Sequence, residues 1–341
     1  MAAERRFGKV ALGPLGLGTA PLGNLFSPVT ERAAAETVRR AQALGIAYVD
    51  TAPHYGNGLS EHRVGAALRE VARDSFVLST KVGRLLTADP TAPRDQHGYV
   101  GVLPFRQRFD YSFDGALRSI EDSLQRLGLA RIDTALIHDI DAFTHGPETQ
   151  PQRFREAMDG ALPALDRLRG EGVIGAVGLG VNDAGVCLDA LRHGGFDGFL
   201  LAGRYTLLDQ SALAELLPAC LERKATVILG GPYNSGILAR PAGAATYDYR
   251  PAPAPMLRRV EAIAAVCAEF NVPLQAAALQ FPLGHPAIVT VLPGARSPEE
   301  VTANHGFARH PIPAAFWHDL RERGLIAATA PVPAGSAGAA L

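Results

Sequence analysis

Short apolar runs alternate with longer stretches of helical periodicity along almost the whole chain. A short apolar run bounded by turn residues is typical of a buried strand. Apolar residues at every third or fourth position are typical of an amphipathic helix. The apolar runs predict strands at 15–18, 47–50, 76–81, 134–138, 176–180, 199–202, 226–229 and 289–292.

The helical stretches between these runs carry recognisable ends. Ser112 precedes one of them and is a good N-cap, and Gly128 follows its last apolar residue, where glycine readily ends a helix. The apolar faces consist of Ala34, Val38, Ala41 and Leu44 after the first strand, Leu117, Ile120, Leu124 and Leu127 after the third, and Phe154, Met158, Ala161, Leu165 and Leu168 before the fifth.

A series of buried strands, each followed by a helix, predicts parallel strands covered on both faces. No break in composition marks a domain boundary, so we expect one (β/α)8 TIM barrel over residues 1–326 and a flexible Ala/Pro/Gly tail over 327–341. A doubly wound sheet is the alternative, and it favours a GxGxxG turn opening directly into a helix. The chain has no GxGxxG, and about a dozen residues separate its first strand from the next helix. The barrel is therefore preferred.

Two connections are longer than ordinary loops, at 82–111 after the third strand and at 233–255 after the seventh. In a barrel both lie at the carboxyl-terminal rim, where binding sites are built. The aromatic residues of the first connection are candidates for a substrate pocket, although packing within the loop explains each of them equally well. These residues are Tyr99, Phe105, Phe109 and Tyr111.

Composition narrows the classes of function. The 341 residues are 47% hydrophobic and 20% charged, which is ordinary for a globular protein. A net charge of −1 gives no electrostatic reason to expect a nucleic-acid partner or an anionic membrane.

Cys187, Cys220 and Cys267 form no CxxC pair, so we expect neither a disulfide nor a zinc site. The N-terminus lacks the apolar core of a signal peptide, which predicts a cytoplasmic protein, either a monomer or a small homo-oligomer.

Polar residues end three successive predicted strands. They are Asp50, Lys81 and His138. In a barrel these strand ends stand side by side at one mouth, so Asp50 and Lys81 are expected to neutralise each other. Lys81 is one of only 3 lysines, whereas the chain has 33 lysines and arginines together. Lysine is a compact charge that perturbs the pKa of a neighbouring group, so its retention here is suggestive.

Tyr55, in the loop after Asp50, completes a candidate proton-transfer site. A phenol has a reference pKa of about 10 and needs a nearby ammonium to exchange protons readily at neutral pH. An ion pair, a packed ring and a buried histidine explain these residues singly, but their shared position favours chemistry. A pyridoxal-phosphate enzyme could use Lys81 as its Schiff base, which leaves Asp50 and Tyr55 unexplained. No HxH, HExxH, GxSxG or P-loop motif occurs, so we expect no metal.

The segments that carry these residues resemble the aldo-keto reductases. The main motif is "YVDTAPHYGNGLSEHRVG", supported by "LSTKVGR", "RIDTALIHDID", "GLGVN" and "PGARSPEEVTAN". The resemblance implies a (β/α)8 barrel that binds an extended nicotinamide cofactor without a Rossmann fold. It also implies that Tyr55 donates or accepts the proton, Lys81 tunes Tyr55, Asp50 holds Lys81, and His138 orients the substrate oxygen.

The same resemblance bears on the choice of cofactor. Many relatives carry Lys and Arg for the 2′-phosphate of NADPH at positions that are Gly294 and Glu300 here. An acid repels a phosphate and suits a free ribose hydroxyl. NAD is therefore expected to be preferred over NADP, although Arg296 remains available to a phosphate.

Other cofactor positions depart from the family's pattern. Val181 replaces the usual Ser before Asn182, and Gly230 stands where a Tyr often stacks on the nicotinamide, a role for which Tyr205 is the candidate substitute. The implied cofactor residues are Thr19, Asp50, Asn182, Tyr205, Gly231, Tyr233, Ser235, Gly236, Gly294, Arg296, Glu300 and Asn304, and the candidate substrate residues are His54, Phe109 and His138.

The segment from "TKVGRLL" to "ALIHD" looks most like the sugar-oxidising branch of the family, the D-threo-aldose 1-dehydrogenases (L-fucose or D-arabinose dehydrogenases) and the related pyridoxal 4-dehydrogenases. Both oxidise a cyclic hemiacetal to a lactone. We expect oxidation of an aldose with NAD, or with NADP, and Tyr55 as the base. The alternatives are pyridoxal oxidation, general aldehyde or ketone reduction and, outside enzymes, a cofactor-sensing subunit of a larger assembly.

Overall fold

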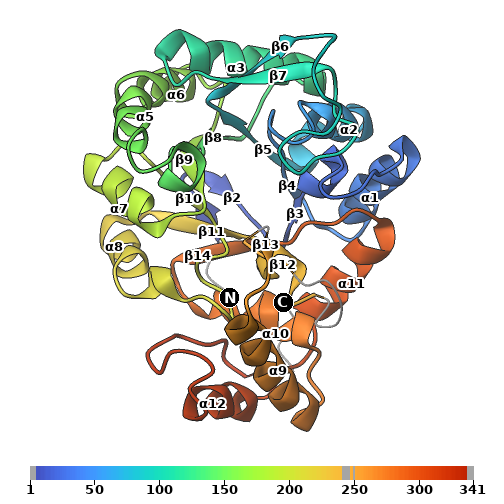
Figure 1. Cartoon of the computed structure of the whole chain (residues 1–341), viewed down its shortest axis with the longest axis vertical. Coiled ribbons are helices and arrows are strands. Elements are labelled where there is room, and N and C mark those ends of the chain that lie inside the picture. Colours follow the sequence, from blue (N-terminus) through green and yellow to red (C-terminus); the bar gives the residue numbers. More distant parts are fainter. Residues whose placement is uncertain (1–4, 240–245, 249, 336–341) are drawn as a thin grey trace.

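Parallel strands form a closed barrel at the centre of the molecule (Figure 1). The computed structural model describes residues 5–239, 246–248 and 250–335. Parallel bridges from Leu15 to Val291 and from Gly18 to Gly294 join the first strand segment to the last and close the sheet. The barrel strands are β3 (Gly16–Gly18), β4 (Tyr48–Asp50), β5 (Val77–Val82), β8 (Thr134–His138), β9 (Ala176–Val181), β10 (Gly198–Ala202), β11 (Thr226–Gly230) and β14 (Ile288–Leu292). The predicted barrel is confirmed.

Helices surround the barrel (Figure 1). Ser112 caps α3 by accepting a hydrogen bond from the Gly115 amide, and Gly128 ends it in the left-handed conformation at φ 65°, as the sequence predicts. The α-helices are α1 (Glu31–Ala43), α2 (Leu59–Leu68), α3 (Phe113–Leu127), α4 (Ala142–His145), α5 (Gln150–Glu156), α6 (Leu162–Gly170), α7 (Ala184–His193), α8 (Leu216–Arg223), α9 (Ala254–Glu269), α10 (Leu274–Gln280), α11 (Pro298–Ala308) and α12 (Ala314–Glu322).

Short helical turns complete the connections. The helix predicted before the fifth strand is α5 and α6 joined by a π-turn, η3 (Ala157–Ala161). Pro163, in the first turn of α6, lacks the amide hydrogen that an unbroken α-helix needs, so the α-helical ladder is interrupted here. The 3-10 turns are η1 (Ala20–Gly23), η2 (Arg73–Ser75), η4 (Ser211–Leu213), η5 (Asn234–Gly236) and η6 (Phe281–Gly284).

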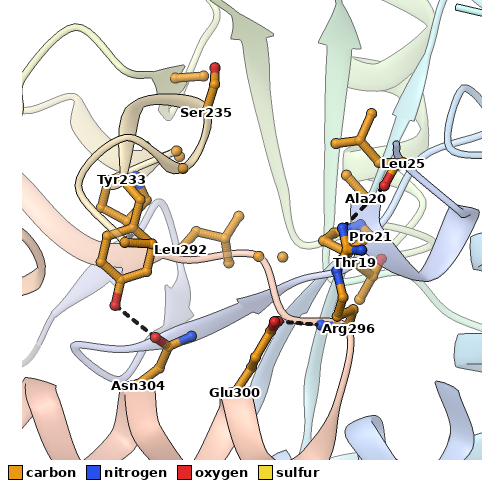
Figure 2. Close-up of a pocket in the computed structure, with 18 of the residues that line it drawn as sticks. Thr19, Ala20, Pro21, Leu25, Tyr233, Ser235, Leu292, Arg296, Glu300 and Asn304 are labelled. Atoms are coloured by element: carbon orange, nitrogen blue, oxygen red, sulfur yellow. Dashed lines mark hydrogen bonds between the residues drawn. The ribbon is translucent and has the colours of Figure 1, made fainter. Parts of the chain in front are cut away.

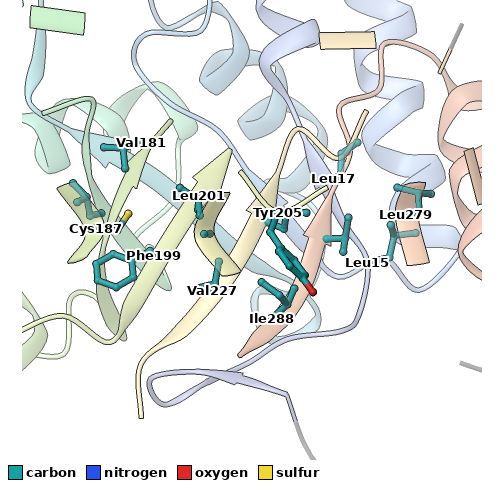
Figure 3. Packing of buried hydrophobic residues seen from close by; sticks show 14 of the residues in the cluster. Leu15, Leu17, Val181, Cys187, Phe199, Leu201, Tyr205, Val227, Leu279 and Ile288 are labelled. Atoms are coloured by element: carbon teal, nitrogen blue, oxygen red, sulfur yellow. The ribbon is translucent and has the colours of Figure 1, made fainter. Parts of the chain in front are cut away.

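Alternate residues of the strands build two separate cores. Phe199 and Leu201 point outward to the helices, and Figure 3 shows them in the layer that includes Cys187 of α7. Leu200, between them, belongs to a smaller cluster inside the barrel with Phe7. This period of two is what a strand with both faces buried requires.

A hairpin that the sequence did not predict contributes Phe7 to that inner cluster. It consists of β1 (Arg6–Phe7) and β2 (Val10–Ala11). A Cβ atom on Gly198 would lie 2.7 Å from the Phe7 ring, so glycine at this position makes room for the ring. Gly198 begins β10, which places the hairpin at the amino-terminal end of the barrel, opposite the predicted site.

The two long connections are partly ordered into strands. Within 82–111, β6 (Arg84–Ala88) pairs antiparallel with β7 (Phe105–Phe109). After β11, the chain forms β12 (Thr246–Tyr247) and β13 (Arg250–Pro251) before α9 begins. The rest of the second connection, at 240–245 and 249, lies outside the described residues.

The predicted tail begins against the barrel. Within 327–335, Ala330 is fully buried and its carbonyl accepts a hydrogen bond from Arg321, while the Pro331 carbonyl accepts one from Tyr205 at 3.4 Å. Ala330 and Pro331 therefore contact the rest of the protein, whereas Ala328, Thr329 and Ala334 are exposed, and the predicted tail at 336–341 lies outside the described ranges.

Among the described residues, no single helix is long and apolar enough to cross a membrane. One bent pair of helices, Ala254–Glu269 with Leu274–Gly284, has the length and composition of a membrane span, and only these two properties suggest it.

Candidate active site

Lys81 joins Asp50 to Tyr55 at the carboxyl-terminal end of β4 and β5. Its ammonium nitrogen donates hydrogen bonds to Asp50 Oδ2 at 2.7 Å, to the Thr51 carbonyl at 2.9 Å and to Tyr55 Oη at 3.0 Å. The side chains of Lys81 and Asp50 are 1% and 2% exposed. Since an ammonium has only three N–H groups, all its donors are used and Tyr55 Oη accepts one of them. The Tyr55 hydroxyl hydrogen therefore points away from Lys81.

A second chain of hydrogen bonds holds the Asp50 side chain in place. Ser79 Oγ donates to Asp50 Oδ1 at 2.6 Å, and Tyr48 Oη lies 2.9 Å from Ser79 Oγ. Burial, with the nearby Asp50 charge, raises the pKa of Tyr48 well above its ordinary value, so Tyr48 stays protonated and donates. Both Asp50 oxygens are thus occupied, which fixes the charge that anchors Lys81.

The loop that carries Tyr55 lies directly against η1. A Cβ on Gly56 would lie 2.4 Å from the Gly23 carbonyl oxygen, and one on Gly23 would lie 2.5 Å from the Tyr55 carbonyl carbon. Gly56 also has φ 68°, a conformation that favours glycine. These two glycines bring Tyr55 back over the strand ends.

His138 ends β8 beside Tyr55. The two ring centres are 6.1 Å apart and the rings are nearly perpendicular, at 84°. Burial, together with the positive charges of Lys81 and Arg84, lowers the pKa of His138 well below its ordinary value. His138 is therefore a neutral imidazole at neutral pH.

Tyr111 is buried and hydrogen-bonds the backbone at His138 instead of lining a substrate pocket. Its hydroxyl hydrogen-bonds the carbonyls of His138 at 2.8 Å and of Asp139 at 3.0 Å, and its side chain is 1% exposed. Phe109 stacks near Tyr111 and lies 4.5 Å from the Arg84 guanidinium. Of the aromatic residues of 82–111, Tyr99 is the one that reaches Tyr55, with ring centres 6.2 Å apart.

Tyr99 belongs to a cover over the site formed by two loops. Leu25, after η1, forms an antiparallel bridge with Tyr99, and the Phe26 amide donates to the Gly98 carbonyl at 2.9 Å. Asn24 strengthens this junction through its side-chain amide, which donates to the Val100 carbonyl at 3.0 Å. The connection between β6 and β7 therefore lies across the mouth of the site.

Three polar residues beside the histidines were missed in the sequence analysis. Arg84 donates to Asp139 Oδ2 at 2.6 Å and to Gln107 Oε1 at 3.1 Å. Gln107 also lies 2.9 Å from His54 Nδ1. A signal was available for Gln107 alone, because "FRQRF" alternates exposed arginines with less exposed residues at the period of a strand.

A cavity of about 720 Å³ extends from Tyr55 and Asp50 to the start of α11. Figure 2 shows Tyr233 donating to Asn304 Oδ1, at 2.7 Å, on one side of the cavity. The Arg296 amide donates to Glu300 Oε2 at 2.9 Å, and the Arg296 guanidinium reaches Ser27 Oγ and the Leu25 carbonyl. The volume falls within the range of pockets that bury a large small-molecule ligand.

The sequence-predicted cofactor residues fall into two groups. Asn182 and Tyr205 do not line the cavity. The backbone N–H of Asn182 donates to Asp141 Oδ2 at 3.2 Å, and the buried Tyr205 ring stacks on Phe281 with ring centres 5.2 Å apart. The prediction of Tyr205 as a nicotinamide-stacking residue is therefore wrong. The other ten predicted residues are among those that line the cavity, namely Thr19, Asp50, Gly231, Tyr233, Ser235, Gly236, Gly294, Arg296, Glu300 and Asn304.

The cavity fits a nicotinamide dinucleotide. Gly231 and Gly236 line it, and a Cβ on either one would extend into open space, because no atom lies within 4 Å at Gly236 and only Gly203 N, at 3.8 Å, at Gly231. At these two positions the missing side chains allow the backbone to approach a pyrophosphate closely. Within the described ranges, no group of three His, Cys, Asp or Glu side chains is placed to hold a metal ion.

Comparison with protein families matches residues 14–323 to the aldo/keto reductase family. The chain belongs to this family. As an aldo/keto reductase it is an NAD(P)-dependent oxidoreductase, of a family that acts on small molecules. It is 44% identical to pyridoxal 4-dehydrogenase of Microbacterium luteolum, over 92% of this chain and 94% of that protein. It is 39% identical to D-threo-aldose 1-dehydrogenase of a Pseudomonas species, over 93% and 95% of the two chains.

Solved structures agree with the family assignment of this aldo/keto reductase. The holo form of an aldo-keto reductase from Bacillus halodurans superposes with a TM-score of 0.72 at 25% identity, over 94% of this chain and 95% of that one. Glycerol dehydrogenase from Gluconobacter oxydans superposes with a TM-score of 0.71 at 20% identity over the whole of both chains, which supports the barrel fold.

Proposed function

We propose that this aldo/keto reductase oxidises the cyclic hemiacetal of pyridoxal to its lactone with NAD. The 44% identity to pyridoxal 4-dehydrogenase over 92% of the chain carries this proposal. From the sequence alone we expect an aldose first, with pyridoxal as the alternative. The comparisons favour that alternative, since the D-threo-aldose 1-dehydrogenase is less similar, at 39%.

The chemistry follows from the two carbon–oxygen groups of pyridoxal. Its aldehyde and the neighbouring hydroxymethyl group close to a cyclic hemiacetal, which has one C–H and one O–H bond at the reacting carbon. Oxidation removes the hydrogen of the C–H bond as hydride and the hydrogen of the O–H bond as a proton, leaving the lactone carbonyl. Bound nicotinamide supplies the acceptor for that hydride.

Tyr55 takes the proton in this proposal. The Lys81 ammonium, 3.0 Å from Tyr55 Oη, stabilises the phenolate that accepts the hemiacetal proton. Asp50, 2.7 Å from Lys81 Nζ, keeps Lys81 charged inside the barrel. Tyr55 therefore acts as a general base during oxidation and as a general acid in the reverse direction.

His138 orients the reacting oxygen. As a neutral imidazole it can donate one hydrogen bond without adding a charge to the site. Its ring lies at 84° to Tyr55, so the two side chains can contact one oxygen from different directions. Donation to that oxygen stabilises the negative charge that the oxygen carries once its proton has left.

NAD is favoured over NADP by Glu300. Its carboxylate lines the cavity and is fixed by the Arg296 amide at 2.9 Å. The Arg296 guanidinium, the cation nearest in sequence, is already engaged by Ser27 and the Leu25 carbonyl. A 2′-phosphate near Glu300 would meet a like charge, whereas a ribose hydroxyl would gain an acceptor.

An aldose is the second candidate substrate, because the D-threo-aldose 1-dehydrogenase matches 93% of the chain. The test is to assay the purified enzyme with NAD and with NADP against pyridoxal, L-fucose and D-arabinose, following reduced nicotinamide by its absorbance and the lactone by mass spectrometry. We expect the highest kcat/KM with pyridoxal and NAD. A higher kcat/KM with either sugar would transfer the proposal to the aldose, and turnover limited to carbonyl reduction would reject both.

A further inference from the structure

We propose that Gln107 fixes His54 as the tautomer protonated on Nδ1, so that His54 presents an unprotonated Nε2 to the substrate and selects substrates that donate a hydrogen bond to it. His54 precedes Tyr55, and the two ring centres lie 6.2 Å apart. In this proposal His54 determines specificity, and Gln107 is a positioning residue that acts through it.

The orientation of the Gln107 amide is determined from one end by Asn57. The Asn57 amide nitrogen donates to the carbonyls of Phe105 at 2.7 Å and Leu103 at 3.3 Å, and carbonyls can only accept. Asn57 Oδ1 therefore faces Gln107 and accepts from Gln107 Nε2 at 2.7 Å. The NH2 group of Gln107 must lie on the Asn57 side.

The same orientation follows independently from the other end. Arg84 has donors only, and its guanidinium lies 3.1 Å from Gln107 Oε1. Asp139, at 2.6 Å, holds Arg84 in this position. The Gln107 oxygen therefore faces Arg84, and the usual ambiguity between the oxygen and nitrogen of an amide does not arise here.

The tautomer of His54 is a consequence of this orientation. His54 Nδ1 lies 2.9 Å from Gln107 Oε1, which can only accept, so Nδ1 carries the hydrogen. Burial and the positive charge of Arg84, followed by His138, lower the pKa of His54 well below its ordinary value, while Asp139 and the hydrogen bond to Gln107 oppose them. The imidazole is then neutral at neutral pH, and Nε2 bears a lone pair.

Nothing in the described part of the chain uses that lone pair. His54 Nδ1 has its partner in Gln107, but Nε2 has no hydrogen-bond partner in residues 5–239, 246–248 and 250–335, and the side chain is partly exposed. Tyr99 and His138 surround the ring, with ring centres 5.3 and 5.8 Å away. His54 does not itself line the cavity of about 720 Å³, but its ring lies beside Tyr55 and His138. In this proposal, an O–H or N–H group of a substrate bound against Tyr55 donates to Nε2.

The first test reads the tautomer directly and needs no substrate. Long-range ¹H–¹⁵N correlation of histidine-labelled enzyme distinguishes protonated from unprotonated ring nitrogens, and His54→Phe assigns the signal. We expect a protonated Nδ1 and an unprotonated Nε2 at neutral pH. Protonation of Nε2, alone or in an imidazolium, would overturn the proposal. Because this experiment is independent of the reaction, its result stands whether or not pyridoxal is the substrate.

Two substitutions of Gln107 test whether this residue sets the tautomer of His54 or only packs beside it. Gln107→Glu keeps the shape and adds a carboxylate beside Nδ1, which favours the imidazolium, so the His54 signal should become doubly protonated at a higher pH than in the wild type. Gln107→Met keeps the size and removes the acceptor, so the preference for the Nδ1 tautomer should be lost. Gln125→Glu, on the exposed side of α3, is the matched control and should leave His54 unchanged. An unchanged His54 signal in both Gln107 variants would contradict the role of Gln107.

The second test rests on the proposed function and measures selectivity. 2-(Hydroxymethyl)benzaldehyde closes to the same kind of hemiacetal as pyridoxal but lacks the ring nitrogen and the ring hydroxyl. We expect His54→Phe to lower kcat/KM for pyridoxal on the order of 10-fold or more relative to this analogue, because both hemiacetals carry the reacting O–H group but only pyridoxal has a further donor on its aromatic ring. An equal loss for both compounds would contradict the proposal. Turnover of the analogue with none of pyridoxal would instead reject pyridoxal as the substrate.

Discussion

The ammonium nitrogen of Lys81 lies 3.0 Å from the phenolic oxygen of Tyr55 and 4.6 Å from the centre of its ring. The side chains belong to different βα units, and the barrel brings them together because β4 and β5 are adjacent parallel strands. The proximity places a fixed positive charge where a phenolate would form.

Removing Lys81 is expected to abolish activity and to destabilise the barrel. In Lys81→Met the phenolate loses its stabilising charge, so kcat should fall by about 10²- to 10⁴-fold. Asp50 is left as an uncompensated buried charge, which lowers the free energy of unfolding by about 3–5 kcal/mol. Turnover assays and urea denaturation measure the two effects.

The double variant Asp50→Asn/Lys81→Met separates these effects. It removes both charges, so it should regain much of the lost stability while remaining inactive. Arg323→Met, which removes one partner of an exposed ion pair with Glu269, is the control and should change stability little. A double variant no more stable than Lys81→Met would argue against the buried charge as the cause.

Arg84 is expected to set the acidic limit of activity. Its positive charge lowers the pKa of both His54 and His138, and the proposed chemistry requires both as neutral imidazoles. Arg84→Met removes that charge and leaves Asp139, 3.4 Å from His138 Nε2, without its arginine partner, and both changes favour the imidazolium. The pKa values should rise, so the acidic limb of the kcat/KM profile should move to higher pH by roughly one unit.

The control for this prediction lies in the same hairpin. Arg106 pairs with Asp89 at the exposed edge of β7, and Arg106→Met should leave the pH profile unchanged. An acidic limb of Arg84→Met that stays in place or moves to lower pH would show that Arg84 does not govern the histidines.

Glu300 is expected to set the cofactor preference. Glu300→Gln removes the charge that would repel a 2′-phosphate and weakens the acceptor for a ribose hydroxyl. The ratio of kcat/KM for NADP to that for NAD should rise on the order of 10-fold, which corresponds to about 1.4 kcal/mol. Glu299→Gln, one residue away and exposed, is the matched control. Equal NADP-to-NAD ratios in Glu300→Gln and the wild type would show that Glu300 does not determine the cofactor preference.

The sequence predicts the barrel because strands buried on both faces leave a simple signal. Each predicted barrel strand ends within one residue of the observed strand, and Asp50, Lys81 and His138 fall at strand ends as expected. Parallel neighbours in a barrel must present those ends at one mouth, so the proximity of Asp50 and Lys81 follows from strand order alone.

The positions of site residues outside the barrel strands depend on long connections, and the sequence does not determine the course of these connections. Tyr205 and Tyr99 are both aromatic residues in loops, yet Tyr205 packs inside the helical layer on Phe281, whereas Tyr99 reaches Tyr55. Their difference comes from long-range packing rather than local pattern. Gln107 becomes meaningful only once β6 and β7 bring it between Arg84 and His54.

Tyr55 is the residue on which the proposed proton transfer depends most directly. The decisive measurement compares Tyr55→Phe with the wild type in two assays, cofactor binding by fluorescence and turnover with pyridoxal and NAD. We predict unchanged binding, since the phenyl ring keeps the shape of the site, and a kcat lower by about 10²- to 10⁴-fold. Near wild-type turnover in Tyr55→Phe, with binding intact, would contradict the account.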